Sequence, residues 1–298
     1  MKYHFILFLI LLASCSTNNT KQQEAVNSKS ERKAIVEKAP QNSGEFLEKF
    51  TQKAINIIST NKYVSFDDLQ KQKLKNIEEN SGVSVSTDTP AEMNGNKLYY
   101  YLQERTLVVG SAFKGQYDGT YLSHASAFVI REDGVILTNY HVVESDTKRS
   151  NIATFVCDKD GNVYPVTDVL SSSQSNDLAI LKIDTKGKKL KAIPFAQVEL
   201  VGEDIYMMGH PFRNTYFMSK GIIARKYVSE RDYEQKIAVT CDYGQGASGG
   251  PIVNTHGQII GMVSSTYIEE VNGNGPVQMV IKEAIPVSTL WNYVKKPE

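Results

Sequence analysis

One glycine-rich run in this sequence places a serine where the backbone is free to turn: GQGASGGP at residues 244–251. Glycine has no Cβ, so Gly246 can direct its N–H inward without a steric penalty, and the N–H of Ser248 can join it. Two such donors would stabilise the charge on the oxygen of a tetrahedral intermediate. The run therefore predicts a nucleophilic serine, Ser248, with an oxyanion hole formed by Gly246 and Ser248.

The same run also fits the G-x-S-x-G nucleophile elbow of α/β-hydrolases, so the positions of the other catalytic groups must decide between the two. That fold requires the chain order Ser, acid, His. His256 is the only histidine after Ser248, and residues 249–255 contain no Asp or Glu. The α/β-hydrolase interpretation is therefore excluded, whereas the order His, Asp, Ser is available upstream.

Two residues upstream of Ser248 have the sequence context of triad members. His141 follows the strand-like run GVILTNY at 134–140 and precedes two valines, so we expect it at a strand end with apolar support. Asp177 precedes the apolar run LAIL, which is typical of a buried strand, and a carboxylate there can hold the imidazole in one tautomer. Asp168 is the alternative acid. The remaining histidines are predicted not to be catalytic: His4, His124, His210 and His256.

Three segments resemble the catalytic blocks of trypsin-like serine proteases, and they are most similar to the bacterial HtrA-type branch: TNYHVV at 138–143, NDLAIL at 176–181 and GASGGP at 246–251. His141, Asp177 and Ser248 are separated by 36 and 71 residues. Further blocks follow in the order of that branch, namely GHPF at 209–212, SKGII at 219–223, GQIIG at 257–261 and AIP at 284–286. The resemblance covers about residues 101–298. It implies a mainly β fold of two six-stranded antiparallel barrels with the triad in the cleft between them.

Short β-like runs separated by turn signals begin near Tyr99, in agreement with that fold. A lysine-rich stretch at 186–191 divides the protease domain into a first barrel at about 101–187 and a second at about 188–298. The run at 287–294 predicts a closing helix. We expect no PDZ module after it, although HtrA proteins usually carry one.

Substrate recognition is predicted from the same resemblance. Asp242 lies six residues before Ser248, where trypsin has the acid that selects Lys or Arg, but Lys282 is placed to neutralise it. Ser264, Ser265 and Thr266 resemble the strand that pairs with the substrate backbone, so extended polypeptides are the expected partners. No His-Glu-x-x-His or paired Cys/His spacing offers a zinc site, and we expect neither a metal nor another cofactor.

Order in the oxyanion loop is predicted to have an unusual source. Digestive trypsin-like enzymes have an Asp immediately before the serine, which pairs with a newly freed N-terminal amine, whereas this chain has Ala247. Activation by insertion of an N-terminus is therefore excluded. Other contacts must order this loop.

The N-terminus carries targeting signals. Residues 1–14 predict a lipoprotein signal peptide, because the apolar run at 3–13 is too short to span a bilayer. The tetrapeptide Leu12-Ala13-Ser14-Cys15 resembles a bacterial lipobox, which implies lipidation of Cys15 and attachment to a membrane; an ordinary secretory signal is the alternative. Ser16 replaces the aspartate that retains lipoproteins at the inner membrane, which implies the outer membrane, facing the periplasm.

Two segments separate this signal from the protease domain. Residues 15–43 are almost wholly polar and predict a disordered tether. Residues 44–100 predict a helical extension, in which Ser65 is the N-cap of a second helix that ends near Gly82. We expect the extension to dock on the protease body; a partner surface or an inhibitory segment over the cleft are the alternatives. The first helix has an apolar stripe of Phe46, Leu47, Phe50, Ala54, Ile57 and Ile58.

Composition sets further limits. The 33 basic residues balance the 33 acidic ones, which argues against nucleic acid as a partner. Cys157 and Cys241 are expected to be free, largely buried thiols, and a disulfide between them in an oxidising periplasm is the alternative. The sequence therefore predicts a serine endopeptidase tethered to the bacterial envelope, with a catalytically latent peptide- or protein-binding lipoprotein as the alternative. No pattern indicates the oligomeric state.

Overall fold

The structure is a computed structural model that describes residues 41–115, 119–144, 149–270 and 275–296. The predicted signal peptide, Cys15 and nearly all of the predicted tether lie outside these ranges. Residues 43–298 form one compact unit, which contains all the helices and strands described below.

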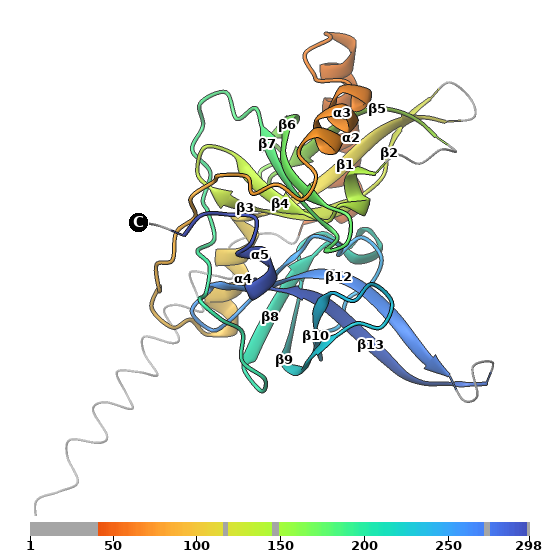
Figure 1. Ribbon diagram of the computed structural model, residues 1–298. Coiled ribbons are helices and arrows are strands. Elements are labelled where there is room, and N and C mark those ends of the chain that lie inside the picture. The colour runs from red at the N-terminus through yellow and green to blue at the C-terminus, as the bar shows by residue number, and fades with distance from the viewer. Residues whose placement is uncertain (1–40, 116–118, 145–148, 271–274, 297–298) are drawn as a thin grey trace, which may run out of the picture. The chain divides into compact units, whose positions relative to one another are not determined.

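The first barrel is built from strands of the N-terminal half of this unit. Among the described residues, six antiparallel strands follow one another in the order β1-β3-β4-β7-β6-β5, and a further pairing of β1 with β5 closes the ring (Figure 1). The short strand β2 lengthens the sheet beside β1. The strands are β1 (Thr106–Lys114), β2 (Thr120–Leu122), β3 (Ala125–Arg131), β4 (Val135–Thr138), β5 (Ser150–Cys157), β6 (Val163–Ser173) and β7 (Leu178–Ile183).

The second barrel also closes on itself, in the order β10-β13-β12-β11-β8-β9. Its strands are β8 (Asp204–Gly209), β9 (Phe217–Val228), β10 (Gln235–Val239), β11 (Pro251–Val253), β12 (Ile259–Glu270) and β13 (Val277–Pro286). Strands β12 and β13 continue beyond the barrel as a long two-stranded arm (Figure 1). The predicted fold class, two six-stranded antiparallel barrels with helices before them, is confirmed.

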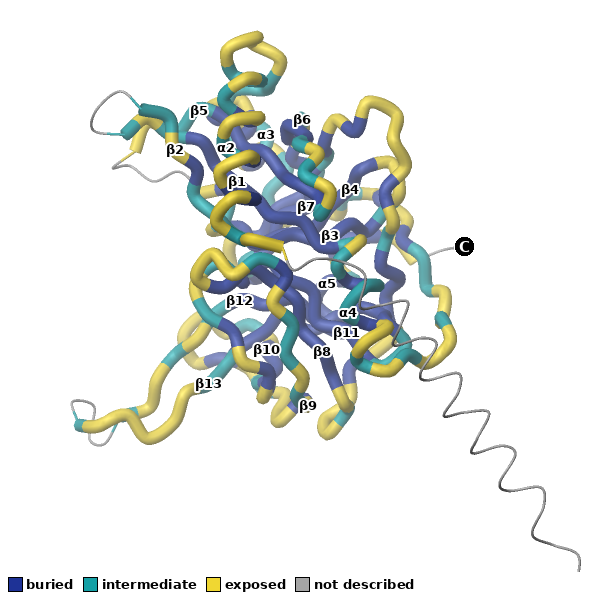
Figure 2. Tube along the Cα trace, turned by 180° about the vertical axis from the view of Figure 1, so that it is seen from behind, coloured by how far each residue is buried: buried dark blue, intermediate teal, exposed yellow. Residues whose placement is uncertain are grey.

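Strand β3 is a central strand that is buried on both faces. Side chains alternate between the two faces of a strand. Ala127 and Val129 join the apolar cluster formed by strands of the first barrel, whereas Phe128 and Ile130 join a second cluster that also contains residues of the other barrel and of the helices. Both faces of β3 are therefore buried, as the dark tube of Figure 2 shows. Cys157 and Cys241 are buried and free, as expected.

Two helices precede the first barrel. Helix α2 (Ser43–Ser59) buries the predicted stripe of Phe46, Leu47, Phe50 and Ala54 in the cluster shared by the two barrels. Helix α3 (Phe66–Lys75) begins as predicted, because the Ser65 hydroxyl accepts a hydrogen bond from the N–H of Asp68 at 3.1 Å. Neither α2 nor α3 has a length and composition that would let it cross a membrane, and this holds for every helix in the described ranges.

The predicted end of α3 near Gly82 is wrong. The helix stops at Lys75 because the Asn76 side chain donates to the carbonyl of Val169 at 2.6 Å and the chain then pairs with β6. Ile77 forms a parallel bridge with Ser172. Hydrogen bonding to a strand far away in the sequence therefore replaces the last turns of the helix.

Two further helices also differ from the sequence-based expectation. Helix α4 (Gly95–Gln103) is capped by Asn94 and runs across the boundary expected at residue 100, where β-structure was predicted. The predicted closing helix at 287–294 is shortened to α5 (Val287–Leu290). After it, the carbonyl of Tyr293 accepts the N–H of Ser81 at 3.0 Å, and Ser84 pairs with Lys295, so the chain end extends along residues 81–85.

Candidate active site

The three residues predicted for the triad lie on connections between strands. His141 opens the 3-10 turn η1 (His141–Val143), which is separated from the end of β4 by two residues, and Asp177 lies in the turn that joins β6 to β7. Ser248 belongs to the loop between β10 and β11 of the second barrel. Each side chain is thus held by a loop whose two ends are fixed in a sheet.

His141 and Asp177 are hydrogen-bonded to each other. The His141 Nδ1 atom lies 2.9 Å from Asp177 Oδ1 and 3.0 Å from Oδ2, and the His141 backbone N–H also donates to Oδ1 at 3.2 Å. Because the carboxylate can only accept, Nδ1 carries the proton and Nε2 of the neutral ring is free to accept one. The pair therefore presents a base on the side of the ring opposite to Asp177.

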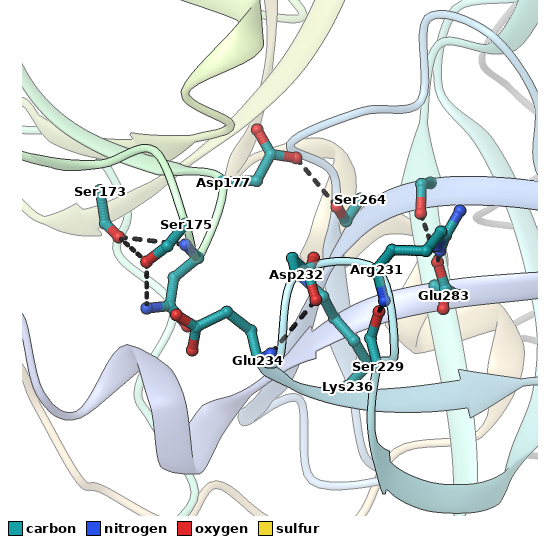
Figure 3. A network of polar contacts seen from close by, with 12 residues as sticks. Ser173, Ser175, Asp177, Ser229, Arg231, Asp232, Glu234, Lys236, Ser264 and Glu283 are labelled. Atoms are coloured by element: carbon teal, nitrogen blue, oxygen red, sulfur yellow. Dashed lines mark hydrogen bonds and ion pairs between the residues drawn. The ribbon is translucent and has the colours of Figure 1, made fainter.

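The orientation of Asp177 is fixed by partners that the sequence did not reveal. Its backbone has a left-handed conformation (φ 54°), which Asp tolerates better than most residues. The Asn139 side chain donates to its carbonyl at 2.8 Å, and the Ser264 hydroxyl donates to its Oδ2 at 2.9 Å (Figure 3). Ser264 was predicted to contact substrate, but its hydroxyl is directed to Asp177. Asn139 is two residues before His141, and only that proximity could have signalled it.

Ser248 and His141 line one pocket of about 260 Å³, together with Gly246 and His124. Among the described residues, no hydrogen bond joins the Ser248 hydroxyl to His141. Such bonds between nucleophile and base are commonly long in the absence of substrate. Asp168, the alternative acid, lines a different pocket with Lys182 on the outside of the first barrel.

The backbone around Gly246 has the geometry of a donor site. Gly246 has φ 98°, and a Cβ there would lie only 2.6 Å from the carbonyl oxygen of His210, so another residue would be strained. The carbonyl of Gln245 accepts the N–H of Phe212 at 2.7 Å. Within a trans peptide the N–H points opposite to the carbonyl, so the N–H of Gly246 is directed away from Phe212. Within the described part of the chain, neither this N–H nor that of Ser248 has an acceptor.

The protonation of the three nearby histidines differs. Burial lowers the pKa of His141, but the hydrogen bond and the charge of Asp177, with a further contribution from Glu144, outweigh burial and raise it above its ordinary value. Burial lowers the pKa of His124 to about 4 and that of His210 to about 3. At neutral pH His124 and His210 are therefore uncharged, whereas Asp177 favours the protonated form of His141.

A second pocket, of about 460 Å³, lies beside the Ser248 loop and is called here the specificity pocket. Its walls include Phe212, Tyr243, Thr266, Asp242 and Lys282. The Asp242 side chain is 85% exposed, and its Oδ1 lies 3.3 Å from the Lys282 ammonium, which also donates to the carbonyl of Tyr243. The negative charge of Asp242 in the wall of this pocket is therefore compensated by the Lys282 ammonium.

Ser265, also predicted to contact substrate, has its hydroxyl turned elsewhere. It donates to Oε2 of the buried Glu283 at 2.7 Å, and Glu283 in turn pairs with Arg231 (Figure 3). Of the predicted substrate-binding residues, Asp242 and Thr266 line the specificity pocket. The hydroxyls of Ser264 and Ser265 instead donate to the carboxylates of Asp177 and Glu283. In the ranges that the structure describes, no group of three or more His, Cys, Asp or Glu is arranged to hold a metal ion.

Comparison with known proteins connects this geometry to a class of enzyme. Residues 125–262 match the model of the trypsin-like peptidase domain. The chain is 34% identical over 155 residues to a probable periplasmic serine endoprotease, DegP-like, of Chlamydia pneumoniae, and 28% identical over 177 residues to Protease Do-like 1, chloroplastic, of Arabidopsis thaliana. These alignments cover 50% and 57% of this chain but only 29% and 38% of the relatives.

A solved structure supports the same fold. The serine endoprotease from Yersinia pestis superposes with a TM-score of 0.50 at 22% identity, over 66% of this chain and 64% of that chain. At this identity the superposition concerns the fold alone, which is that of chymotrypsin-like proteases. Together, the domain match over residues 125–262, the endoprotease relatives and the two barrels support a serine protease hydrolase with the chymotrypsin-like fold.

Proposed function

We propose that this protein is a serine endopeptidase that cleaves extended or unfolded polypeptide with the triad His141, Asp177 and Ser248. The observation that carries the proposal is the hydrogen bond of 2.9 Å between His141 Nδ1 and Asp177 Oδ1, made by a histidine that shares a pocket with Ser248. The endoprotease names of the relatives support the same reaction.

In the proposed reaction, the Ser248 hydroxyl attacks the carbonyl carbon of the substrate and its proton passes to Nε2 of His141. Asp177 stabilises the imidazolium that forms. The N–H groups of Gly246 and Ser248 bind the oxygen as it becomes negative, which lowers the energy of the tetrahedral intermediate. His141 then donates its proton to the departing amine, and a water molecule hydrolyses the acyl-enzyme by the same route in reverse.

The substrate is proposed to bind as an extended strand along residues 264–266, the segment of β12 that leaves the barrel. Strand addition satisfies the substrate backbone without selecting its sequence, which suits unfolded chains. The residue before the cleaved bond would then enter the specificity pocket. The ion pair of Asp242 with Lys282 argues against strong selection for Lys or Arg there.

The proposal further places the enzyme at the bacterial envelope. The lipobox-like sequence before Cys15 and the word periplasmic in the names of relatives from Chlamydia pneumoniae and Rhizobium meliloti support this location. A lipid on Cys15 would attach the chain to the outer membrane from the periplasmic side, with the polar segment that follows as a tether.

Labelling of Ser248 tests the catalytic proposal most directly. A fluorophosphonate probe should label the wild-type protein but not Ser248→Ala, and casein cleavage should fall by on the order of 10⁶-fold in Ser248→Ala and about 10⁴-fold in Asp177→Asn. Casein cleavage that survives Ser248→Ala would refute the triad. A wild-type protein that neither reacts with the probe nor cleaves casein would favour the alternative, a catalytically latent binding lipoprotein.

A further inference from the structure

Ser126 connects the first barrel to the backbone of the proposed oxyanion hole. It lies on β3, is fully buried, and bonds to the Ser248 loop through two different groups. Its hydroxyl donates to the carbonyl of Gly246 at 2.9 Å, and its backbone N–H donates to the carbonyl of Ser248 at 2.9 Å. The residue therefore holds the loop at both positions whose N–H groups would bind the oxyanion.

The hydroxyl of Ser126 has a defined direction. It accepts the backbone N–H of His210 at 3.1 Å, and a hydroxyl has one proton to donate. Because a lone pair of the hydroxyl oxygen accepts the His210 N–H, the hydroxyl proton is directed to the Gly246 carbonyl. The carbonyl of Ser126 itself accepts from the Thr138 hydroxyl at 2.8 Å, three residues before His141. One serine thus ties together the strand that leads to the base and the loop that carries the nucleophile.

Both peptide groups that flank Gly246 are held in this way. The peptide before it is fixed by the bond from Phe212 N–H to the Gln245 carbonyl, and the peptide after it by the bond from the Ser126 hydroxyl to the Gly246 carbonyl. Two fixed peptide planes determine φ and ψ of the glycine between them. This matters because a glycine alone has no preference for the value of φ, 98°, that it adopts here.

We propose that Ser126 is a positioning residue that orders the oxyanion hole from the first barrel. The proposal rests on the proposed function, since it assigns a role within that catalytic site. It accounts for the order of a loop in which Ala247 offers no carboxylate for an ion pair. A neutral hydrogen-bond network supplied by the neighbouring barrel holds the donors in place, and no cleavage of the chain is needed to form it.

The test is Ser126→Ala in the full-length protein, with a fluorogenic peptide taken from a casein site that the wild-type protein cleaves. The change leaves the Gly246 carbonyl and the His210 N–H without their partner. The Ser248 loop should then relax, and the N–H groups of Gly246 and Ser248 should no longer point at the oxyanion. We expect kcat to fall about 10- to 100-fold, because a displacement of about 1 Å at a catalytic group costs rate on this scale. KM should stay within about twofold, because Ser126 does not line the specificity pocket.

A peptide boronate of the same sequence separates positioning from general support. Its tetrahedral adduct places an anionic oxygen in the hole, so its affinity should fall in parallel with kcat while KM does not. Ser172→Ala is the matched control, since it also removes a buried hydroxyl of the first barrel that donates to a backbone carbonyl, that of Lys73, at 3.0 Å. The control should keep both kcat and boronate affinity.

Two outcomes would overturn the proposal. Ser126→Ala with kcat and boronate affinity within twofold of wild type would overturn it, as would an equal loss of kcat in Ser172→Ala. If Ser126→Ala does not fold, Ser126→Cys replaces it, because a thiol fills the site but is a weak donor, and its kcat should fall with KM retained. A wild-type protein without turnover or fluorophosphonate labelling would contradict the proposed function itself, an outcome separate from any difference between variants.

Discussion

The raised pKa of His141 determines how the proposed enzyme should respond to pH. Only the neutral imidazole accepts the proton of Ser248, and a raised pKa keeps the ring protonated up to a higher pH. The acidic limb of kcat/KM should therefore have its midpoint above about 6.5, the ordinary value for histidine. Measurement of kcat/KM for a peptide between pH 5 and 9 checks this.

The charge of Glu144 offers a way to shift that limb without altering the base. Glu144 contributes to the raised pKa of His141 through its charge. Glu144→Gln should move the midpoint to lower pH and leave the plateau rate nearly unchanged. Glu132→Gln, which removes an exposed carboxylate that lines another pocket, should leave the midpoint in place. A midpoint below 6, or one that moves equally in both variants, would contradict this account of the pH response.

Lys282 should control which residues the specificity pocket accepts. Its ammonium lies 3.3 Å from Asp242, and so compensates the one acid in the walls of that pocket. Lys282→Met should leave Asp242 unpaired and increase kcat/KM for Lys or Arg before the cleaved bond about fivefold relative to uncharged residues, the scale of an exposed ion pair.

The double variant Asp242→Asn/Lys282→Met should lose that gain, which is measured with peptides that differ at this one residue. If the single variant shows no change in preference, the proposed placement of the substrate in the specificity pocket is wrong.

The proposed catalytic residues stand out in the sequence, whereas the residues that support them do not. His141, Asp177 and Ser248 each lie in a short local run whose residue types suit the chemistry. Ser126 and Phe212 act through contacts with the backbone of residues far away in the sequence, and such contacts leave no local pattern. Ser264 was noticed, but only the structure directs its hydroxyl to Asp177.

Helix α2 is an integral part of the protease body, and this has a measurable consequence for stability. Phe50 is 1% exposed, and its ring packs so closely on β1 that a Cβ added to Gly110 would lie 2.9 Å from it. Phe50→Ala should lower the free energy of unfolding by about 3–5 kcal/mol, the usual cost of such a cavity.

Urea unfolding checks that value, with Glu48→Ala as the control on the exposed side of the same helix, for which a change within about 0.5 kcal/mol is expected. Peptidase activity separates this role from that of an inhibitory lid. A lid weakened by Phe50→Ala would raise activity, and a rise with unchanged stability would replace our interpretation with autoinhibition.

Local patterns predicted where elements begin better than where they end. The stripe of α2 and the cap of α3 depend on residues within a few positions of each other. The early end of α3 depends on Asn76 bonding to Val169, and the short α5 depends on Tyr293 bonding to Ser81. In both places the chain forms hydrogen bonds to a segment far away in the sequence in place of further helical hydrogen bonds. A short stretch of sequence does not contain both partners, so it cannot predict where such a helix ends.

At the scale of the whole molecule, the described residues form two apolar clusters that lie mainly within one barrel each and a third that the barrels share. The shared cluster combines Phe128 and Ile130 of the first barrel with Met208 and Met262 of the second. This apolar packing, together with the hydrogen bonds from Ser126 to the Ser248 loop, maintains the relative placement of the barrels and hence of His141 and Ser248. The two barrels and their order could be anticipated from the family resemblance, but the cluster between them could not.

The proposed attachment to the membrane through Cys15 is tested by Cys15→Ala. If the lipid on Cys15 is the anchor, this variant should leave the membrane fraction or accumulate as uncleaved precursor, while Ser16→Ala should behave as the parent protein. Fractionation of cells with detection of the protein by antibody distinguishes them. A Cys15→Ala protein that matures and stays with the membrane would show that the anchor lies elsewhere.

The division of the site between two barrels also affects when a newly made chain becomes active. His141 and Asp177 are synthesised before Ser248, and the barrel that holds Ser248 closes only when β13, which ends at Pro286, pairs with β10 and β12. Domains made first tend to fold first. A ribosome-bound chain would therefore fold its first barrel around half a site, and the proposed protease would remain inactive toward itself and its neighbours until β13 has been made and has paired with β10 and β12.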